Sequence, residues 1–231
     1  MENVIFVNRY ENDDILFSLN RKEVLRYAGY LGALDKADDN LNDIVDEVIN
    51  ECKKTLTYKV CYRRMEYDLA SADKETEFLY KSKDLDRCLN GSKEVIIFAA
   101  TIGIGIDRLI AKYQRLSPVK ALFMQAYGAE RVEKLCDIFC KEIKEKVAGE
   151  GLYVTPRFSP GYGDMLLEAQ KDVFRLLDCS RQIGVSLNQS LLMTPSKSVT
   201  AIFGLRDYEC MDISHKCSKC GKTDCLYRNI K

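Results

Sequence analysis

The sequence predicts a single α+β domain, in which helices pack against a twisted, mainly antiparallel or mixed sheet, followed by a cysteine-rich tail. Segments with helical spacing of apolar residues are mixed with segments of strand character, and no regular strand–helix–strand repeat is present. The length of 231 residues fits one large domain with a substantial core. We place this domain at residues 1–208 and the tail at residues 209–231.

The N-terminal elements are short. Two apolar runs come first and are interpreted as a strand and an anchoring segment: Val4–Val7 and Ile15–Phe17. Asn20 and Glu23 have the spacing of a capping box, and Gly29 is placed to end a helix. These signals predict a short helix over residues 21–28.

An amphipathic helix follows. One face repeats at i, i+3, i+4 and i+7 with acidic residues between its members, which are Leu41, Ile44, Val45, Val48, Cys52 and Leu56. Tyr58–Tyr67 favours a half-exposed strand, because Tyr, Val and Cys alternate there with Arg and Lys. Residues 68–93 are charged and are expected to cross the surface, with a short helix at Lys83–Leu89.

Glu94–Ala100 is a continuous apolar run of strand length, which predicts a central strand buried on both faces. Gly103 and Gly105 then lead into a helical pattern from Ile106 to Tyr113. A glycine turn from strand to helix is compatible with phosphate binding at the helix N-terminus. A tight turn that needs positive φ is favoured, because the third glycine and the Walker lysine are both missing.

Ser117 and Pro118 are typical of a helix start, and Gly128 is expected to interrupt or end that helix. Helical spacing resumes from residue 129 to residue 147 and carries Cys136 and Cys140 one turn apart. Two thiols at this spacing can share a metal ion, but packing of small apolar side chains is the favoured interpretation.

Strand, loop, helix and two further strands complete the predicted domain. In order, these are a strand at Leu152–Thr155, a shaped loop at 157–164, a helical pattern ending at Leu177, and strands at Ile183–Leu187 and Ser198–Gly204. The loop reads Arg-Phe-Ser-Pro-Gly-Tyr-Gly-Asp. Proline fixes φ and glycine supplies positive φ, so such a loop is tightly turned and is a candidate for function.

Composition excludes several classes of function. The 35 basic and 35 acidic residues balance, which gives no electrostatic case for binding nucleic acid or an anionic membrane. The longest apolar run, Val95–Ile106, is too short to span a bilayer and contains glycines. The N-terminus has no basic region ahead of an apolar stretch, so a cytoplasmic protein is expected. Six of the ten cysteines lie in apolar patterns and are interpreted as buried hydrophobes.

Three motifs together resemble the activation domain of cobalamin-dependent methionine synthase, and most closely its free-standing form. They are the 157–164 loop, Ile-Gly-Val at 183–185, and Met-x-Pro-x-Lys-Ser-Val at 193–199. The resemblance spans residues 20–205. It implies the predicted α+β fold and a site for S-adenosylmethionine.

The resemblance implies ligand contacts at Arg157, Ser159 and Tyr162, with Gly161 in the same loop. Arginine suits the carboxylate of the ligand because its planar fork forms bidentate pairs. Ser159 stands where the longer enzymes have Ala, which a backbone contact would tolerate. The family also has an acidic contact on the preceding helix, for which Glu133 is favoured over Glu130. Without the resemblance, a structural salt bridge and a packed ring are the favoured interpretation of such a loop.

The implied function is reductive remethylation of the corrinoid of a cobalamin-dependent methyltransferase, methionine synthase first among them. Methyl transfer from a sulfonium needs in-line placement and no general acid or base, so the missing catalytic set is no objection. This chain has no Asp-x-His-x-x-Gly cobalamin motif, so a partner protein is expected to present cobalamin. A flavodoxin or ferredoxin is the implied reductant. The alternative is a non-catalytic docking or chaperone module for a corrinoid protein.

The tail gathers four cysteines around the only histidine of the chain, His215. The predicted metal ligands are Cys210, Cys217, Cys220 and Cys225. The Cys-x-x-Cys spacing followed by glycine suits zinc, and three or four thiolates suit an iron–sulfur cluster equally well. Reduced surface thiols or a redox pair are the alternatives. A cluster would allow the tail to donate the low-potential electron, and a third interpretation is an iron–sulfur redox protein.

Overall fold

A computed structural model describes residues 4–11, 18–30, 39–68 and 76–209. Within these ranges, the centre of the molecule is a five-stranded sheet with the order β1-β2-β3-β7-β4. The strands are β1 (Phe6–Tyr10), β2 (Tyr58–Glu66), β3 (Glu94–Thr101), β4 (Tyr153–Val154) and β7 (Ser198–Arg206). Every neighbouring pair is antiparallel. The predicted α+β fold with a mainly antiparallel sheet is confirmed.

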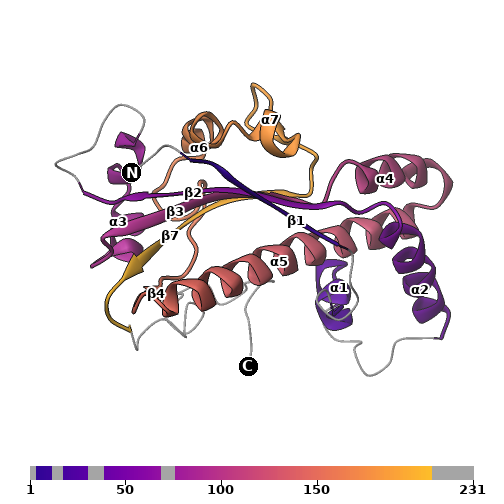
Figure 1. Cartoon of the computed structure of the whole chain (residues 1–231). Helices are drawn as coiled ribbons and strands as arrows, with labels where there is room; N and C mark the ends of the chain where they lie inside the picture. The colour runs from indigo at the N-terminus through magenta and orange to yellow at the C-terminus, as the bar shows by residue number, and fades with distance from the viewer. Residues whose placement is uncertain (1–3, 12–17, 31–38, 69–75, 210–231) are drawn as a thin grey trace.

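Helices cover both faces of the sheet (Figure 1). On one face are α1 (Arg21–Tyr27), α2 (Asp39–Lys53), α4 (Gly105–Leu116) and the long α5 (Pro118–Ala148). On the other are α3 (Lys83–Leu89), α6 (Gln170–Leu177) and α7 (Cys179–Ile183), with the 3₁₀ turns η2 (Glu77–Tyr80) and η3 (Leu167–Ala169). A two-stranded hairpin joins β5 (Ser186–Leu187) to β6 (Met193–Thr194).

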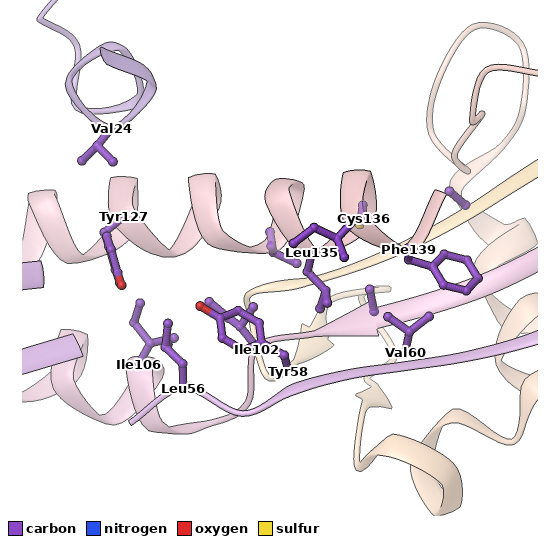
Figure 2. Close-up of a cluster of buried hydrophobic side chains, with 14 of the residues drawn as sticks. Val24, Leu56, Tyr58, Val60, Ile102, Ile106, Tyr127, Leu135, Cys136 and Phe139 are labelled. Carbon is purple, nitrogen blue, oxygen red and sulfur yellow. The ribbon is translucent and has the colours of Figure 1, made fainter. Parts of the chain in front are cut away.

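Strand β3 separates two hydrophobic cores. Ile96 and Phe98 point into the core beneath α5, whereas Val95 and Ile97 point into the core beneath α6 and α7. This alternation explains why the run is continuously apolar, since side chains on both faces are buried. Figure 2 shows the α5 side, where Phe139 and other apolar side chains meet those of the strands. The predicted central strand is therefore confirmed.

The expected helix boundary at Gly128 is wrong, because α5 runs without a break through this residue. A Cβ at Gly128 would lie 2.8 Å from Ile106 Cδ1 and 3.0 Å from Lys197 Cγ. Glycine at this point therefore allows α4 and the chain before β7 to approach the helix closely. Its weak helix propensity, about 1 kcal/mol below alanine, is overridden by the packing of the rest of α5.

Two of three further predictions, for a helix cap, a turn and a strand, are confirmed, and the third is partly wrong. The Asn20 side chain accepts a hydrogen bond from the Glu23 N–H at 3.3 Å, which confirms the predicted cap of α1. Gly103 has φ of +83°, as the tight-turn interpretation requires. The predicted strand at residues 183–187 is wrong in its first half, because Ile183 ends α7 and Gly184 caps it with φ of +74°.

Some expectations lie outside the described residues, namely the anchoring segment at 15–17 and the cysteine tail. Strand β2 is more buried than expected in its first half, because side chains on both of its faces lie in the cores: Tyr58, Val60 and Tyr62 in the core beneath α5, and Cys61 in the core beneath α6 and α7. Within the described ranges, no helix is both long enough and apolar enough to cross a bilayer.

Candidate functional site

The 157–164 loop lies beside β7, beyond the two positions at which the short β4 pairs with that strand. Phe158 and Ile202 exchange two backbone hydrogen bonds of 2.8 Å, which fixes the start of the loop against β7. Phe158 and Ile202 form an isolated bridge; a continued ladder would next exchange hydrogen bonds between Pro160 and Thr200, and proline has no N–H to donate. The backbone pairing therefore stops at Pro160, and an opening remains beside the first residues of β7.

The loop is held in a defined turn. Gly161 has φ of +90°, and its N–H donates to the Met165 carbonyl oxygen at 2.9 Å. Met165 in turn donates to the Tyr162 carbonyl oxygen at 3.0 Å, and Tyr162 donates to Ser159 at 3.2 Å. The Tyr162 side chain is 68% exposed, so these bonds present an aromatic ring to solvent.

Asp164 anchors the far end of the loop to α3. Its carboxylate accepts hydrogen bonds from the Lys83 N–H at 2.9 Å and the Asp84 N–H at 3.1 Å, and also from the Ser82 hydroxyl. These donors belong to the first turn of the helix, where backbone N–H groups have no helical partner. The bond from Ser82, followed by those from the backbone, holds the pKa of Asp164 below its usual range.

A cavity of about 250 Å³ opens between this loop, α5 and β7. It is lined by Glu133, Arg157, Phe158, Ser159, Tyr162 and Val199. The structure thus brings together four of the five residues predicted to bind the cofactor. Gly161, the fifth, shapes the turn and does not line the cavity.

Arg157 is held by two carboxylates of α5. Its Nη2 donates to Glu133 Oε2 at 2.6 Å, and its Nη1 donates to Asp137 Oδ1 at 2.7 Å. One quarter of the Arg157 side chain is exposed, so the guanidinium remains accessible from the cavity. Asp137 was missed from the sequence, although its position four residues after Glu133 places both on one helix face.

Cys136 and Cys140 lie behind Arg157. Burial raises the pKa of the Cys140 thiol to about 11, and it raises the pKa of Cys136 well above its usual value. Burial thus disfavours the thiolate form that a reactive cysteine or a metal ligand uses, in keeping with the packing interpretation. The part of the chain that the structure describes contains no cluster of three or more His, Cys, Asp or Glu side chains suited to a metal.

A second cavity of about 470 Å³ lies between α1 and α5. Its lining residues are Asn20, Glu23, Arg26, Tyr27, Glu130, Glu133, Lys134 and Asp137. Glu133 borders both cavities, so the ion pairs of Arg157 stand between them. The α1 residues were missed, because nothing in their local sequence indicates contact with a helix more than 100 residues away.

Glu130, the second acidic candidate, has a different role. Its carboxylate forms a buried ion pair with Arg131 and accepts a 3.1 Å hydrogen bond from the Asn20 N–H. Burial raises the pKa of Glu130, and the neighbouring Arg131 charge opposes this shift. Glu130 therefore fastens the start of α1 to α5, whereas Glu133 is the acidic residue that faces Arg157.

The protein is thus an α+β domain with a candidate site for a small ligand in the Arg157 cavity beside β7. A family model described as "Vitamin B12 dependent methionine synthase, activation domain" matches residues 89–209, more than half of the chain. The chain therefore belongs to the activation-domain family of vitamin B12-dependent methionine synthase, as its motifs predicted.

A solved structure of the same fold is the "MetH Reactivation Domain bound to AdoHcy". The TM-score is 0.59 at 12% sequence identity, over 90% of this chain and 80% of the other. At this identity the likeness concerns the fold alone. A search of curated proteins finds no match.

Proposed function

We propose that this protein binds S-adenosylmethionine at the Arg157 cavity and supports reductive remethylation of a corrinoid carried by a partner methyltransferase, methionine synthase first among them. Family membership supports the reactivation role. The single observation that carries the ligand assignment is the charge pattern at the cavity. The Arg157 guanidinium pairs with Glu133, which lines the same cavity, and with Asp137, which lines the adjoining one, and this pattern complements the zwitterion of an amino acid.

Exchange of ion-pair partners is the proposed binding step. The ligand carboxylate takes the Arg157 fork in a bidentate pair, and the ligand ammonium takes Glu133 and Asp137. Each charge leaves one partner for another and none is left unpaired, which avoids the cost of an isolated buried charge. Ser159 and Tyr162 line the same cavity, and we assign the backbone of Ser159 and the ring of Tyr162 to the remainder of the ligand.

The size of the ligand supports the use of both cavities. Binding sites for small molecules are typically about 300–1,000 Å³. The cavity at Arg157, about 250 Å³, falls below that range, and the cavity at α1 adjoins it through Glu133. We assign Glu23 as a further acidic contact to the ligand, because it lines the second cavity.

When bound, S-adenosylmethionine supplies a methyl group that passes to the partner's cobalt, together with one electron from a flavodoxin- or ferredoxin-type reductant, and S-adenosylhomocysteine leaves. The residues of this chain hold the donor in line and shield one side of it from water. Tyr162 is assigned to the cavity mouth because its ring is exposed there. The partner must approach from that side.

A methyl-transfer assay tests the proposal. The protein, a corrinoid methyltransferase with oxidised cobalt, a reductant and S-adenosylmethionine with a deuterated methyl group are incubated anaerobically. We expect label on the corrinoid only when the protein is present, and at least tenfold less label with Tyr162→Ala. Tyr153→Ala, which removes an exposed ring of β4 outside the cavity, is the matched control.

The alternative, a docking or chaperone module, predicts a different outcome. In that case the protein would bind the corrinoid partner, but no label would be transferred under any condition.

The tail is included in the proposal as a metal site formed by Cys210, Cys217, Cys220 and Cys225. An iron–sulfur cluster there would pass the electron from the reductant to the partner's cobalt, and zinc would act as a structural clip.

A further inference from the structure

A third cavity, of about 420 Å³, lies on the other side of the 157–164 loop, between the start of α3 and α6. We call it the α3–α6 groove. It is lined by Phe78, Lys81, Ser82, Asp164, Met165, Leu166, Glu168, Ala169 and Asp172. None of these residues borders the two cavities assigned to the methyl donor. The proposed function therefore leaves this groove without a role.

The groove combines an apolar floor with an acidic rim. Phe78 and Met165 form buried walls, and Leu166 is 72% exposed at the edge. Three carboxylates and one ammonium line the groove, so its lining residues carry a net charge of −2. Glu168 is exposed and has no ion-pair partner in the part of the chain described. A segment with large apolar side chains and a positive charge would match both features.

The described chain leaves the domain close to this groove. The Tyr208 hydroxyl donates to the Asn90 carbonyl oxygen at 3.3 Å, and Arg206 donates to the same oxygen at 3.4 Å. Asn90 caps the C-terminal end of α3, and Ser82 at the other end of this helix lines the groove. At 1.5 Å per residue the two ends are roughly 10 Å apart.

Residues 210–231 have the required chemistry. They contain five basic and two acidic residues, a net charge of +3 with histidine neutral. Leu226, Tyr227 and Arg228 form the one place in this stretch where two large apolar side chains adjoin a cation. The segment between residue 209 and Leu226 spans on the order of 50 Å when extended, so reach is not limiting.

We propose that Leu226–Arg228 docks in the α3–α6 groove, with the apolar side chains against Phe78 and Met165 and the cation at Glu168. Cys225 is adjacent to this segment, and Met165 follows Tyr162 by three residues. Docking therefore brings the tail cysteines alongside the loop that lines the Arg157 cavity. The inference does not depend on which ligand that cavity binds or on which metal the cysteines hold.

Photo-crosslinking of the full chain tests this placement. p-Benzoylphenylalanine in place of Tyr227 reacts with nearby C–H bonds, and Met165 and Leu166 present such bonds in the groove. Irradiation without S-adenosylmethionine is expected to give crosslinks within one molecule to residues 78–82 or 164–172. Leu166→Asp is expected to reduce their yield at least tenfold. Leu116→Asp changes a similarly exposed leucine, 68% against 72%, at the end of α4 and is expected to have no effect.

Three outcomes would overturn the proposal. Crosslinks that join two chains would assign the groove to a second copy of the protein. Crosslinks confined to other surfaces, or equal losses with both leucine variants, would place the tail elsewhere. Because the donor is absent from the experiment, none of these results bears on S-adenosylmethionine binding, and the two proposals fail independently.

Discussion

Two arginines of this protein show how the surroundings of a side chain decide its role. Arg157 bridges Glu133 and Asp137, and Arg64 bridges Glu94 and Glu150 with nearly the same exposed fraction, 25% against 26%. Arg64 lines none of the three cavities described above. A guanidinium between two carboxylates is therefore not by itself a ligand site, and the adjoining cavity makes the difference at Arg157.

At the same scale, Asp164 provides a prediction that depends on pH. Hydrogen bonds from the start of α3 lower its pKa in the folded state, so its contribution to stability is fully present above the unfolded value of about 3.9. That contribution is lost as pH falls through the folded pKa. We expect Asp164→Asn to lower the urea midpoint at pH 7, and we expect its difference from the wild type to shrink as pH falls below about 3.9.

Urea unfolding across this pH range measures the effect. Asp43→Asn, which changes an exposed carboxylate of α2, serves as the control and should shift the midpoint little at any pH. A difference between wild type and Asp164→Asn that stays constant from pH 7 to pH 3 would contradict the capping role of this carboxylate.

At the scale of single elements, α5 depends on a glycine that its own sequence pattern does not explain. Alanine at position 128 should gain up to about 1 kcal/mol in helix propensity. Its methyl group would collide with Ile106, which is fully buried, and with the stem of Lys197. Overpacking of this kind costs about 1–3 kcal/mol. We therefore expect Gly128→Ala to destabilise the protein by roughly 1 kcal/mol, measured by chemical denaturation.

Gly149→Ala is the matched control, because Gly149 has helical φ and a methyl group added there would lie 3.6 Å from its nearest neighbouring atom. This variant should be neutral or slightly stabilising. Equal stabilisation by both alanine variants would mean that a methyl group fits at position 128 beside Ile106 and Lys197, which would contradict our account.

Features that depend on residues near one another in the sequence could be predicted, whereas features that depend on tertiary contacts could not. The cap of α1 and the two-sided burial of β3 follow from neighbouring residues, and both are confirmed. The continuity of α5 depends on Ile106 and Lys197, which are distant in sequence. Likewise, Gly184 was assigned to a strand, although its positive φ ends α7.

At the scale of the whole molecule, the candidate site was only partly predictable. The loop residues and Glu133 followed from motifs and a family resemblance, and the structure places Arg157, Ser159, Tyr162 and Glu133 around one cavity. The contribution of α1 could not be predicted, because Glu23 meets α5 only through the packing of two helices. The order of the sheet strands likewise depends on pairings that no single segment encodes.

We propose the cysteine tail as a metal site, and this proposal can be tested separately from the donor site. We expect anaerobically purified protein to contain a bound metal, and Cys217→Ser combined with Cys220→Ser to remove it. Elemental analysis together with acid-labile sulfide distinguishes the possibilities. Iron with sulfide supports electron donation, zinc without iron makes the tail a structural clip, and no metal contradicts the site. Cys88→Ser, within the folded domain, is the control and should retain the metal.

The central claim is that Arg157 and its two carboxylates form the donor site. Calorimetric titration with S-adenosylmethionine tests it most directly, with Arg157→Ala compared with Arg64→Ala. We predict micromolar binding to the wild type, a loss of at least tenfold for Arg157→Ala, about 1.4 kcal/mol, and wild-type affinity for Arg64→Ala. Equal affinity in all three proteins, or no binding even with a cobalamin protein present, would contradict the assignment and favour a docking module.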